Sequence, residues 1–495
     1  MKNIKKVLAS LLLVIVLASA LIVVSKVNKT RSVKVGEEYN PKGEAVVISI
    51  DEYGGWNGLL IANGGLITTT DSINAKNGIK IKYVVENDAT VSSDKLISGE
   101  YQGAGYTVNR YAFLQNKFDK ANVPTIMPYI TNYSNGGDGI IATSDITSVE
   151  DLVGKKIAVP QHSEAQTLIE WLLKNSSLTD EQVKTIRKNM VFYNTADETA
   201  DAFFAGEVDA AATWEPYLTE ALSSTESRIL FDTSMATNLV MTGIVFNQEF
   251  AENHQEFMEK MIDGALQSRE TYLKDFNGLR QMPAFKLASD EELYEMCNYA
   301  SLATYADNMS VLNSTCKNVY KDMAEIWLTV GEKATPERAE EVFTDKYMSL
   351  LKGKYDEDDF TTFAFSADGR KAAENIANNS ALLKVTLNVE FEADSAKIKS
   401  SSYEDLKEFA EVAKLLNGTY IQIEGNTAKV EGTDGVEFSK KRATSVAKYL
   451  HRLGVDYDRF IIVGNGDKNP IASNSTEEGK QKNRRTEVFF KVTGY

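Results

Sequence analysis

The sequence has 495 residues, of which 43% are hydrophobic and 25% are charged. This length exceeds the roughly 250–300 residues at which one hydrophobic core stops growing, so two or more domains are expected. The formal net charge of −16 argues against wholesale binding of nucleic acid. With three histidines, two cysteines and no CxxC or HExxH motif, the chain offers no ligand set for zinc or haem and no thiol nucleophile. We therefore predict no cofactor, no metal site and no catalytic residue.

The N-terminus predicts export or anchoring. Three lysines precede the uncharged, mostly apolar run Val7–Val24. At about 1.5 Å per residue, a helix over this run is about 27 Å long, close to the hydrocarbon thickness of a bilayer. We therefore expect a single membrane-spanning anchor within residues 1–26. A cleavable signal peptide ending at Ala18–Ala20 is the alternative. In both cases the bulk of the chain lies outside the cytoplasm, in the periplasm or cell wall.

After a polar tether at 27–43, short apolar runs alternate with helical periods. Strands are expected at Val46–Ile50, Ile79–Val85, Gly139–Ala142, Lys156–Val159, Met190–Tyr193 and Gly243–Phe246. Helical pieces are expected at Asp94–Ile97, Ala165–Lys174, Thr199–Phe204 and Pro216–Ala221. This alternation indicates an α/β fold with mostly parallel strands. Residues 250–352 then have a helical pattern throughout, with helix starts at Asp290 and Pro336.

A weak internal repeat links two parts of this region. Ser98–Thr107 aligns without a gap with Ala205–Trp214. The identical pairs are Gly99 and Gly206, Glu100 and Glu207, and Ala104 and Ala211. In each copy a short helix ends at glycine, a strand of small residues follows, and hydroxyl and aromatic side chains close it. Because α/β sheets bind ligands beyond the carboxyl ends of their strands, the repeat predicts two similar lobes with facing tips. Chance similarity is the alternative.

Three motifs in this half carry a family resemblance: Asp51–Leu60, Ser148–Pro160 and Gly206–Tyr217. They resemble solute-binding proteins of ABC importers, in the branch that handles nitrate, taurine, aliphatic sulfonates and thiamine precursors. The resemblance covers about residues 44–330. It implies a bilobed periplasmic-binding-protein type II fold at 44–352, with the second lobe at about 143–238, that closes over a small molecule by a hinge motion.

Candidate ligand contacts lie on the loops of both lobes. Ser163 occupies a helix N-cap position and Gln166 follows at capping-box spacing. Helix capping alone would therefore explain a serine at this position. The free N–H groups of the same helix end would also attract an anion, with Glu164 competing. Trp214 could pack between helices or form a cleft wall. The expected ligand-binding residues are Tyr53, Trp56, Tyr106, Thr107, Ser163, Thr213, Trp214 and Glu215.

A second unit follows the charged stretch Lys352–Asp359, which is typical of a solvated linker; we place the linker at 353–382 and the unit at 383–495. Its pattern predicts the order β-α-β-α-β-β. The expected elements are a strand within Leu387–Ile398, a helix at Ser402–Leu416 capped by Ser402, a strand at Tyr420–Glu424, a helix at Phe438–Leu453, and strands at Phe460–Val463 and Thr486–Val492.

This unit resembles the OmpA/MotB-type peptidoglycan-binding domain. The matching blocks are Val389–Phe391 with Ser395–Ile398, Ile423–Thr427, Phe438–Ala443, Gly464–Gly466, Pro470–Asn474 and Asn483–Arg485. The resemblance implies an α+β domain in which an arginine and an aspartate grip the stem peptide of the wall. Arg442 matches the arginine, whose planar fork suits a carboxylate. Ala428 stands where the family has its aspartate, which puts the usual affinity in doubt. Thr427, Asp434 and Arg485 complete the expected peptidoglycan-binding set.

The sequence therefore predicts a non-catalytic solute-binding component of an ABC importer for a small, anionic solute, tethered to membrane and peptidoglycan. The expected partners are the solute, an ABC permease, peptidoglycan and, through the N-terminal helix, the membrane. A wall-anchored structural or sensory protein is the alternative. An enzyme ranks third, because pyrimidine-forming enzymes share the bilobed fold but need iron and several histidines. Cys297 and Cys316 could form a disulfide or remain buried thiols.

Overall fold

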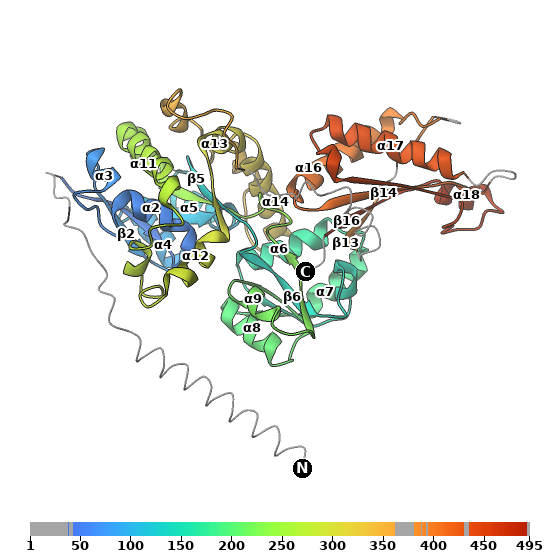
Figure 1. Ribbon diagram of the computed structural model, residues 1–495, viewed down its shortest axis with the longest axis horizontal. Helices are drawn as coiled ribbons and strands as arrows, with labels where there is room; N and C mark the ends of the chain where they lie inside the picture. The colour runs from blue at the N-terminus through green and yellow to red at the C-terminus, as the bar shows by residue number, and fades with distance from the viewer. Residues whose placement is uncertain are drawn as a thin grey trace, which may run out of the picture.

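The computed structural model describes residues 38, 43–361, 381–387, 389–392, 395–429 and 435–492. Within these ranges the chain forms two lobes and a C-terminal domain (Figure 1). In this described part, every helix is too short or too polar to cross a bilayer. The expected anchor Val7–Val24 lies outside the described residues.

The first lobe is built on a 7-stranded sheet of order β12-β5-β11-β3-β1-β2, with β4 also paired to β11. Strands β1, β2 and β3 are parallel, and β11 runs antiparallel to β3. The strands are β1 (Val46–Ile50), β2 (Ile81–Val85), β3 (Gly103–Thr107), β4 (Thr125–Ile126), β5 (Ile130–Ser134), β11 (Met241–Asn247) and β12 (Ala300–Leu302). The helical segments are η1 (Gly54–Trp56), α2 (Asn57–Asn63), α3 (Ile73–Lys76), α4 (Ala89–Ser98) and α5 (Val108–Ala121).

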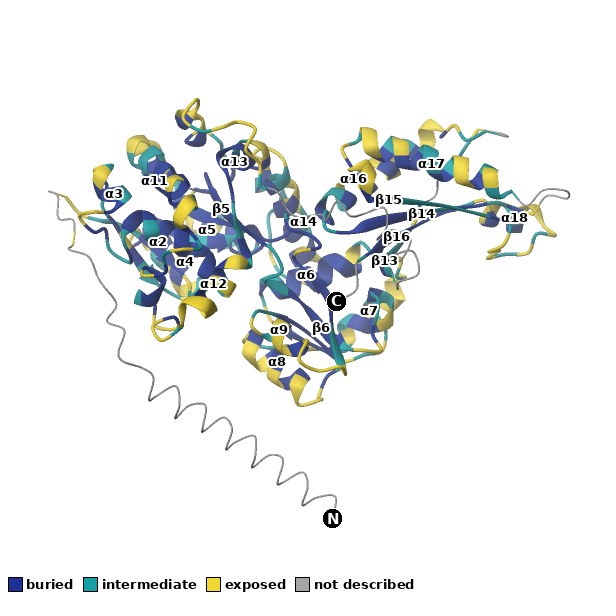
Figure 2. Cartoon of the chain, in the orientation of Figure 1, coloured by how far each residue is buried: buried dark blue, intermediate teal, exposed yellow. Residues whose placement is uncertain are grey.

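The second lobe has a 5-stranded sheet of order β10-β6-β9-β7-β8. Strands β7, β8 and β9 are parallel, and β6 runs antiparallel to β9. The strands are β6 (Asp138–Thr143), β7 (Ile157–Pro160), β8 (Met190–Tyr193), β9 (Ala210–Trp214) and β10 (Ser227–Asp232). The helical segments are η2 (Val149–Leu152), α6 (Glu164–Lys174), α7 (Asp180–Lys188), α8 (Ala196–Phe204) and α9 (Tyr217–Ala221). In both lobes the inner strands are buried and exposed residues lie on the outer helices and loops (Figure 2), whereas the edge strand β8 exposes Val191 and Phe192.

The internal repeat corresponds to equivalent strands of the two lobes. β3 lies between the parallel strand β1 and the antiparallel strand β11, just as β9 lies between β7 and β6. In the first lobe Tyr106 pairs with Gly243, and in the second its counterpart Thr213 pairs with Gly139. The helix before each strand is followed by a glycine with positive φ, at 80° for Gly99 and 72° for Gly206. The repeat therefore reflects a shared topology, and the prediction of two similar lobes is confirmed.

The remainder of the first half is mostly helical, as expected, with one exception. The helical segments are α10 (Gln248–Asn253), α11 (Gln255–Gln267), η3 (Ser268–Thr271), η4 (Leu279–Gln281), α12 (Asp290–Asn298), α13 (Tyr305–Val311), α14 (Thr315–Thr329), η5 (Pro336–Glu340) and η6 (Met348–Leu351). The exception is β12, which adds an antiparallel edge strand to β5. Helix α14 packs against α5 of the first lobe and α6 of the second, so it bridges the lobes.

The structure decides the state of the two cysteines and the environment of the charged stretch after the lobes. Cys297 and Cys316 are separate buried thiols: the first contacts the carbonyl of Gly54 and the second lies 3.8 Å from the sulfur of Met241. The charged stretch Lys352–Asp359 does not behave as a solvated linker along its whole length, because Tyr355 donates a 2.7 Å hydrogen bond to Asp263.

The C-terminal domain has a 4-stranded sheet of order β13-β16-β14-β15. Its elements are β13 (Ala381–Leu387), η7 (Ser400–Ser402), α16 (Tyr403–Leu415), β14 (Tyr420–Asn426), α17 (Val436–Arg452), η8 (Tyr457–Arg459), β15 (Phe460–Gly466), α18 (Glu477–Asn483) and β16 (Thr486–Lys491). Helices α16 and α17 lie over one face of the sheet, and α18 lies at one end of it (Figure 1). The expected order is correct apart from α18, which lies between the last two strands.

Two expectations for this domain need correction. The first strand is Ala381–Leu387, which pairs with β16, whereas the described residues of the alternating run that follows contribute only an isolated bridge between Phe391 and Ile398. Ser402 precedes α16 as expected, but its hydroxyl does not cap the helix. It accepts a 2.8 Å hydrogen bond from the backbone N–H of Glu390 and so fixes the preceding loop instead.

Candidate functional site

The two lobes meet where α5 and α6 begin. Thr107 closes β3 and caps α5, because its hydroxyl accepts the N–H of Arg110 at 3.0 Å. Across the junction the same hydroxyl donates to Oε1 of Glu164, the first residue of α6, at 2.8 Å. Arg110 donates from Nε to Oε1 at 3.3 Å and from Nη2 to Oε2 at 3.1 Å. These three bonds form a forked, charge-assisted contact between the lobes.

The Arg110–Glu164 pair is largely withdrawn from water, with side-chain exposures of 24% and 15%. Burial raises the pKa of the Glu164 carboxyl, but the charge of Arg110 and the hydrogen bonds from Arg110 and Thr107 outweigh it and hold the pKa below its ordinary value. The N-terminal end of α6 favours a negative charge as well. The helix end that was expected to attract an anion therefore carries a carboxylate of the chain itself.

Two further carboxyl groups lie near this contact. Asp51 directly follows β1 and accepts a 2.6 Å hydrogen bond from the indole N–H of Trp56. Asp138 begins β6, pairs in register with Trp214 and accepts a 2.6 Å hydrogen bond from the hydroxyl of Ser134. Burial, with a smaller contribution from the charge of Glu164, raises the pKa of both carboxyls, that of Asp138 to about 7. The lobe junction therefore contains two carboxyl groups, Asp51 and Asp138, in addition to Glu164.

The aromatic candidates of the first lobe have different environments. Trp56 is only 1% exposed, and its ring lies so close to Gly105 that a Cβ there would sit 2.6 Å from it. Its indole holds Asp51 from within the core. Tyr53 is half-buried, packs edge-on against Trp56 and donates a 3.0 Å hydrogen bond to Asn132.

Tyr106 and Thr213, the equivalent residues of the repeat, are buried within their own lobes. Tyr106 donates to the hydroxyl of Ser92 at 2.9 Å, and Thr213 donates to the carbonyl of Ala196 at 3.4 Å. The next residues along the two strands, Thr107 and Trp214, are both half-buried. At the ends of the two equivalent strands, Thr107 and Trp214 are therefore the residues that remain partly accessible to a solute.

The remaining predicted contacts are engaged locally. Ser163 is buried and caps α6: its hydroxyl accepts the N–H of Gln166 at 3.1 Å and donates to the carbonyl of Pro160. The side chain of Gln166 accepts the N–H of His162 at 2.7 Å, one residue earlier than a capping box requires. Glu215 is half-buried and accepts two hydrogen bonds from Thr219.

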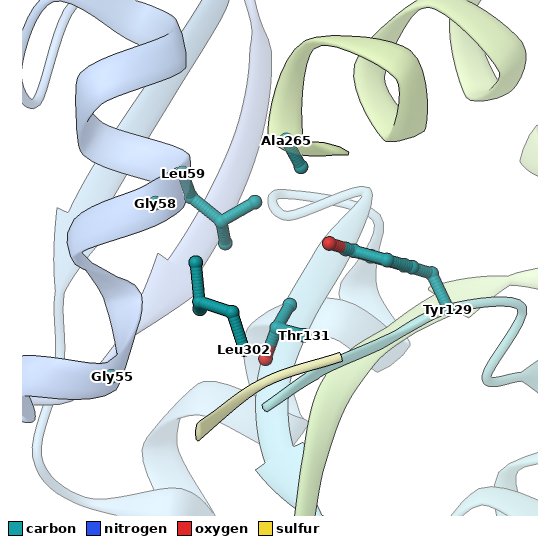
Figure 3. Close-up of a pocket in the computed structure, with 7 residues that line it drawn as sticks. All are labelled: Gly55, Gly58, Leu59, Tyr129, Thr131, Ala265 and Leu302. Carbon is teal, nitrogen blue, oxygen red and sulfur yellow. The ribbon is translucent and has the colours of Figure 1, made fainter. Parts of the chain in front are cut away.

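A hollow inside the first lobe does not suit a solute. Its empty volume is about 190 Å³, and Thr107, Arg110 and Glu164 of the interlobe contact are not among its lining residues. The lining residues are Gly55, Gly58, Leu59, Tyr129, Thr131, Ala265 and Leu302, and the hydroxyl of Tyr129 points into the space (Figure 3). Ligand pockets typically measure about 300–1,000 Å³. The hollow is smaller than that, and Tyr129 and Thr131 are the two lining residues with a hydroxyl group, so it offers no site for an anionic solute.

In the C-terminal domain Arg442 of α17 lies between two aromatic rings. Its guanidinium carbon is 4.8 Å from the ring centre of Phe391 and 4.4 Å from that of Phe438. Its Nε donates a 3.1 Å hydrogen bond to the carbonyl of Ser395. Two aromatic faces hold the planar group in one orientation, as recognition of a carboxylate requires.

The other wall-binding candidates lie around β14. Thr427 follows this strand, and its hydroxyl is buried without a hydrogen-bond partner among the described residues. Ala428 is 5% exposed. Arg485 donates at 2.6 Å to Glu487 and at 3.0 Å to the carbonyl of Asn469. Asp434 lies outside the described residues.

Sequence reasoning missed three residues of the lobe junction: Arg110, Asp51 and Asp138. Asp51 directly follows an expected strand, and α/β sheets place functional side chains at this position. Its role at the junction could therefore have been predicted from the sequence. Asp138 lies immediately before another expected strand. Arg110 is one of several charged residues on a helix, and only the placement of the lobes reveals its partner.

Two family models match separate parts of the chain. Residues 75–275 match the family described as NMT1/THI5 like, and residues 390–484 match the OmpA family. The chain thus contains an NMT1/THI5-like domain followed by an OmpA domain. Both assignments agree with the expected organisation.

Individual similar proteins were found for both parts. The chain is 38% identical to outer membrane porin F of Pseudomonas aeruginosa over 110 residues, which is 22% of this chain and 31% of that protein. It is 39% identical to the peptidoglycan-binding protein ArfA of Mycobacterium tuberculosis over 102 residues, 20% of this chain and 31% of that protein. The chain therefore spans about a third of the length of these curated relatives. The crystal structure of the periplasmic aliphatic sulphonate binding protein SsuA from Escherichia coli aligns with 62% of this chain and 99% of that chain, at 16% identity and a TM-score of 0.47.

The raised pKa of Asp138 generates a prediction about stability. As pH falls through about 7, the folded protein takes up a proton at Asp138, whereas the unfolded chain stays ionised until near the ordinary value of 3.8. The folded state then binds more protons, so this group makes the protein more stable as pH falls from about 7 to about 4. We expect Asp138→Asn to remove this component, measured as the difference in melting temperature from the unmodified protein across that range.

The exposed Asp71→Asn is the matched control for the loss of one carboxyl group. Parallel profiles for Asp138→Asn and the unmodified protein would show that Asp138 is ionised in the folded state at neutral pH.

Proposed function

We propose that this chain is an extracytoplasmic solute-binding protein of an ABC importer that is held to the cell wall by its C-terminal domain. The observation that carries the first part is the interlobe contact of Thr107 and Arg110 with Glu164. Two lobes of the same topology, joined by crossing segments and touching through polar groups at strand and helix ends, form an arrangement that can open and close around a small molecule.

The family matches support the two halves of the proposal separately. The NMT1/THI5-like match lies over the lobes, and the OmpA match lies over the domain that carries Arg442. One relative of the latter is named a peptidoglycan-binding protein. Both roles place the bulk of the chain in the cell envelope, with the N-terminal segment as the proposed membrane anchor. No step of this function needs covalent chemistry, so we propose a binding protein and not an enzyme.

The solute is proposed to bind at the lobe junction, with Trp214 and Tyr53 as half-buried aromatic walls. A solute with an anionic group would compete with Glu164 for the guanidinium of Arg110 and for the start of α6. The screen that tests the function measures thermal shifts of the purified chain with nitrate, sulfonates, phosphate and neutral heterocycles. A solute at about 100 times its dissociation constant should stabilise the folded form by about 2.7 kcal/mol. If none of these classes stabilises the lobes, the structural or sensory alternative gains support.

The competition at Arg110 can be tested with Glu164→Gln. The amide keeps an oxygen that can accept from Thr107 but removes the charge that neutralises Arg110. We expect affinity for the anions of the screen to rise about tenfold, equivalent to about 1.4 kcal/mol, as measured by titration calorimetry. The exposed Glu207→Gln in the same lobe is the control for net charge. A general loss of anion affinity in Glu164→Gln would mean that Glu164 assists binding.

The aromatic wall can be tested with Trp214→Ala. If Trp214 lines the solute site, solute affinity falls at least tenfold, about 1.4 kcal/mol, while the melting temperature of the unliganded protein changes little. Truncation of a core tryptophan would instead cost about 3–5 kcal/mol of stability. Measuring both quantities separates the two roles: a large drop in unliganded stability with unchanged affinity would assign Trp214 to packing.

Wall binding can be tested by cosedimentation of the purified chain with diaminopimelate-type peptidoglycan. We expect Arg442→Ala to reduce the bound fraction, because the oriented guanidinium is the proposed carboxylate contact. Ala428→Asp should increase it, because this change supplies the carboxylate expected at that position. Equal sedimentation of the two variants and the unmodified protein would dispose of the pocket assignment.

A further inference from the structure

Two segments of the chain connect the lobes side by side. One runs from β5 to β6 through Asn135–Gly137, and the other runs from β10 to β11 through Thr233–Val240. The hydroxyl of Thr233 joins them: it pairs with the hydroxyl of Ser134 at 2.8 Å and accepts the N–H of Gly136 at 3.0 Å. A rotation of one lobe against the other must change the backbone of these segments, so together they form the hinge.

The C-terminal domain contacts the second hinge segment directly. The contact is made by the turn Asn417–Gly418 between α16 and β14. The side chain of Asn417 accepts the N–H of Thr237 at 3.1 Å and donates to the hydroxyl of Thr237 at 2.7 Å. The N–H of Gly418 donates to the carbonyl of Met235 at 3.0 Å. Three hydrogen bonds, all to buried residues of the hinge segment, thus fix the turn in one orientation.

The approach at Gly418 is close enough to exclude a side chain. A Cβ built there would lie 2.1 Å from the carbonyl oxygen of Ser234 and 2.9 Å from Cα of Met235. The contact is continuous with the apolar core, because Met235 and Leu239 of the hinge and Leu416 before the turn are all buried members of one connected apolar cluster. Strand β13 of the same domain also lies against η2 of the second lobe, and Figure 1 shows β13 beside that lobe.

The hydrogen bonds depend on one backbone conformation of Ser234–Thr237. This is the conformation present while the lobes touch through Arg110 and Glu164. A hinge rotation that moves Met235 or Thr237 would break bonds to the turn. Docking of the domain and contact between the lobes are therefore expected to stabilise each other. The coupling free energy is the same whichever of the two events comes first.

We propose that the turn Asn417–Gly418 is a clasp on the hinge, through which the C-terminal domain favours the state in which the lobes touch. The inference rests on the proposed function in that lobe closure is taken to be the solute-binding motion. Release of the clasp lets the lobes separate, and separation of the lobes weakens the clasp. Whatever holds the C-terminal domain can then alter the affinity of the lobes for their solute.

The test uses the full chain without solute, so its outcome is independent of whether the lobes bind one. Spin labels at Lys76→Cys and Ser224→Cys, exposed positions in the first and second lobes, report the distance between lobes. The two native cysteines are buried and should remain unlabelled. Gly418→Val inserts a side chain into the contact, Asn417→Ala removes two hydrogen bonds, and Glu408→Ala, at an exposed position on α16, is the control.

Hydrogen exchange at residues 234–237 reports docking in the same samples. We expect about a tenfold faster exchange there in Gly418→Val, together with a longer and broader distance distribution between the lobes. Asn417→Ala should shift both in the same direction by less, and Glu408→Ala should change neither. Rapid exchange throughout β14 and β16 in the same samples identifies any variant whose C-terminal domain has failed to fold, and if Gly418→Val fails in this way, the result for Asn417→Ala tests the proposal.

Two results would overturn the proposal. Faster exchange at 234–237 with an unchanged interlobe distance would mean that the domain docks but does not influence the hinge. Unchanged exchange in both variants would mean that the turn does not hold the hinge segment. Neither result would bear on solute binding, which the thermal-shift screen measures separately.

Discussion

The contact between Arg110 and Glu164 is the constraint on which the state of the two lobes depends. It joins the starts of two helices, one from each lobe, and both side chains are largely withdrawn from water. When the lobes separate, both charged groups regain water, so the hydration they recover offsets much of the attraction that is lost and the net contribution of the pair to closure is small. A solute that binds one partner can therefore displace the other at little cost. An internal pair of this kind therefore suits a protein that must close around a solute and reopen.

The hinge that permits this motion is restrained in a different way. Thr233 links both crossing segments through neutral hydrogen bonds, and Ser134 passes the link on to Asp138 at the start of the second-lobe sheet. A burial-raised pKa near 7 means that the Asp138 carboxyl is easily neutralised close to the hinge. The hinge segments are thus linked to the Asp138 carboxyl of the lobe junction. Through Met235 and Thr237 they are also linked to the C-terminal domain.

The sequence predicted those parts of the fold that follow from local pattern. Strand β1 was placed at its observed bounds because a buried parallel strand is a short continuous apolar run. Strand β5 was missed because its sequence, ITNYS, is largely polar, yet every residue is buried. Thr131 and Asn132 achieve this by donating to the carbonyls of Thr242 and Gly55, and those partners are distant in sequence. The Arg110–Glu164 contact could not be predicted either, because its two residues are also distant in sequence. The sequence alone indicates only that Glu164 competes with an anion at the start of its own helix.

The energy of the hinge clasp fits a modulating role better than a locking one. Each of its three hydrogen bonds contributes about 0.5–1.5 kcal/mol net, since water competes for the same groups. Their sum is a few kcal/mol, which changes a two-state population by one to three powers of ten but remains below the roughly 5.5 kcal/mol needed to invert a 99:1 distribution. Solute binding can therefore still overcome or reinforce the clasp. A domain held by the wall would adjust the resting balance of the lobes without preventing their motion.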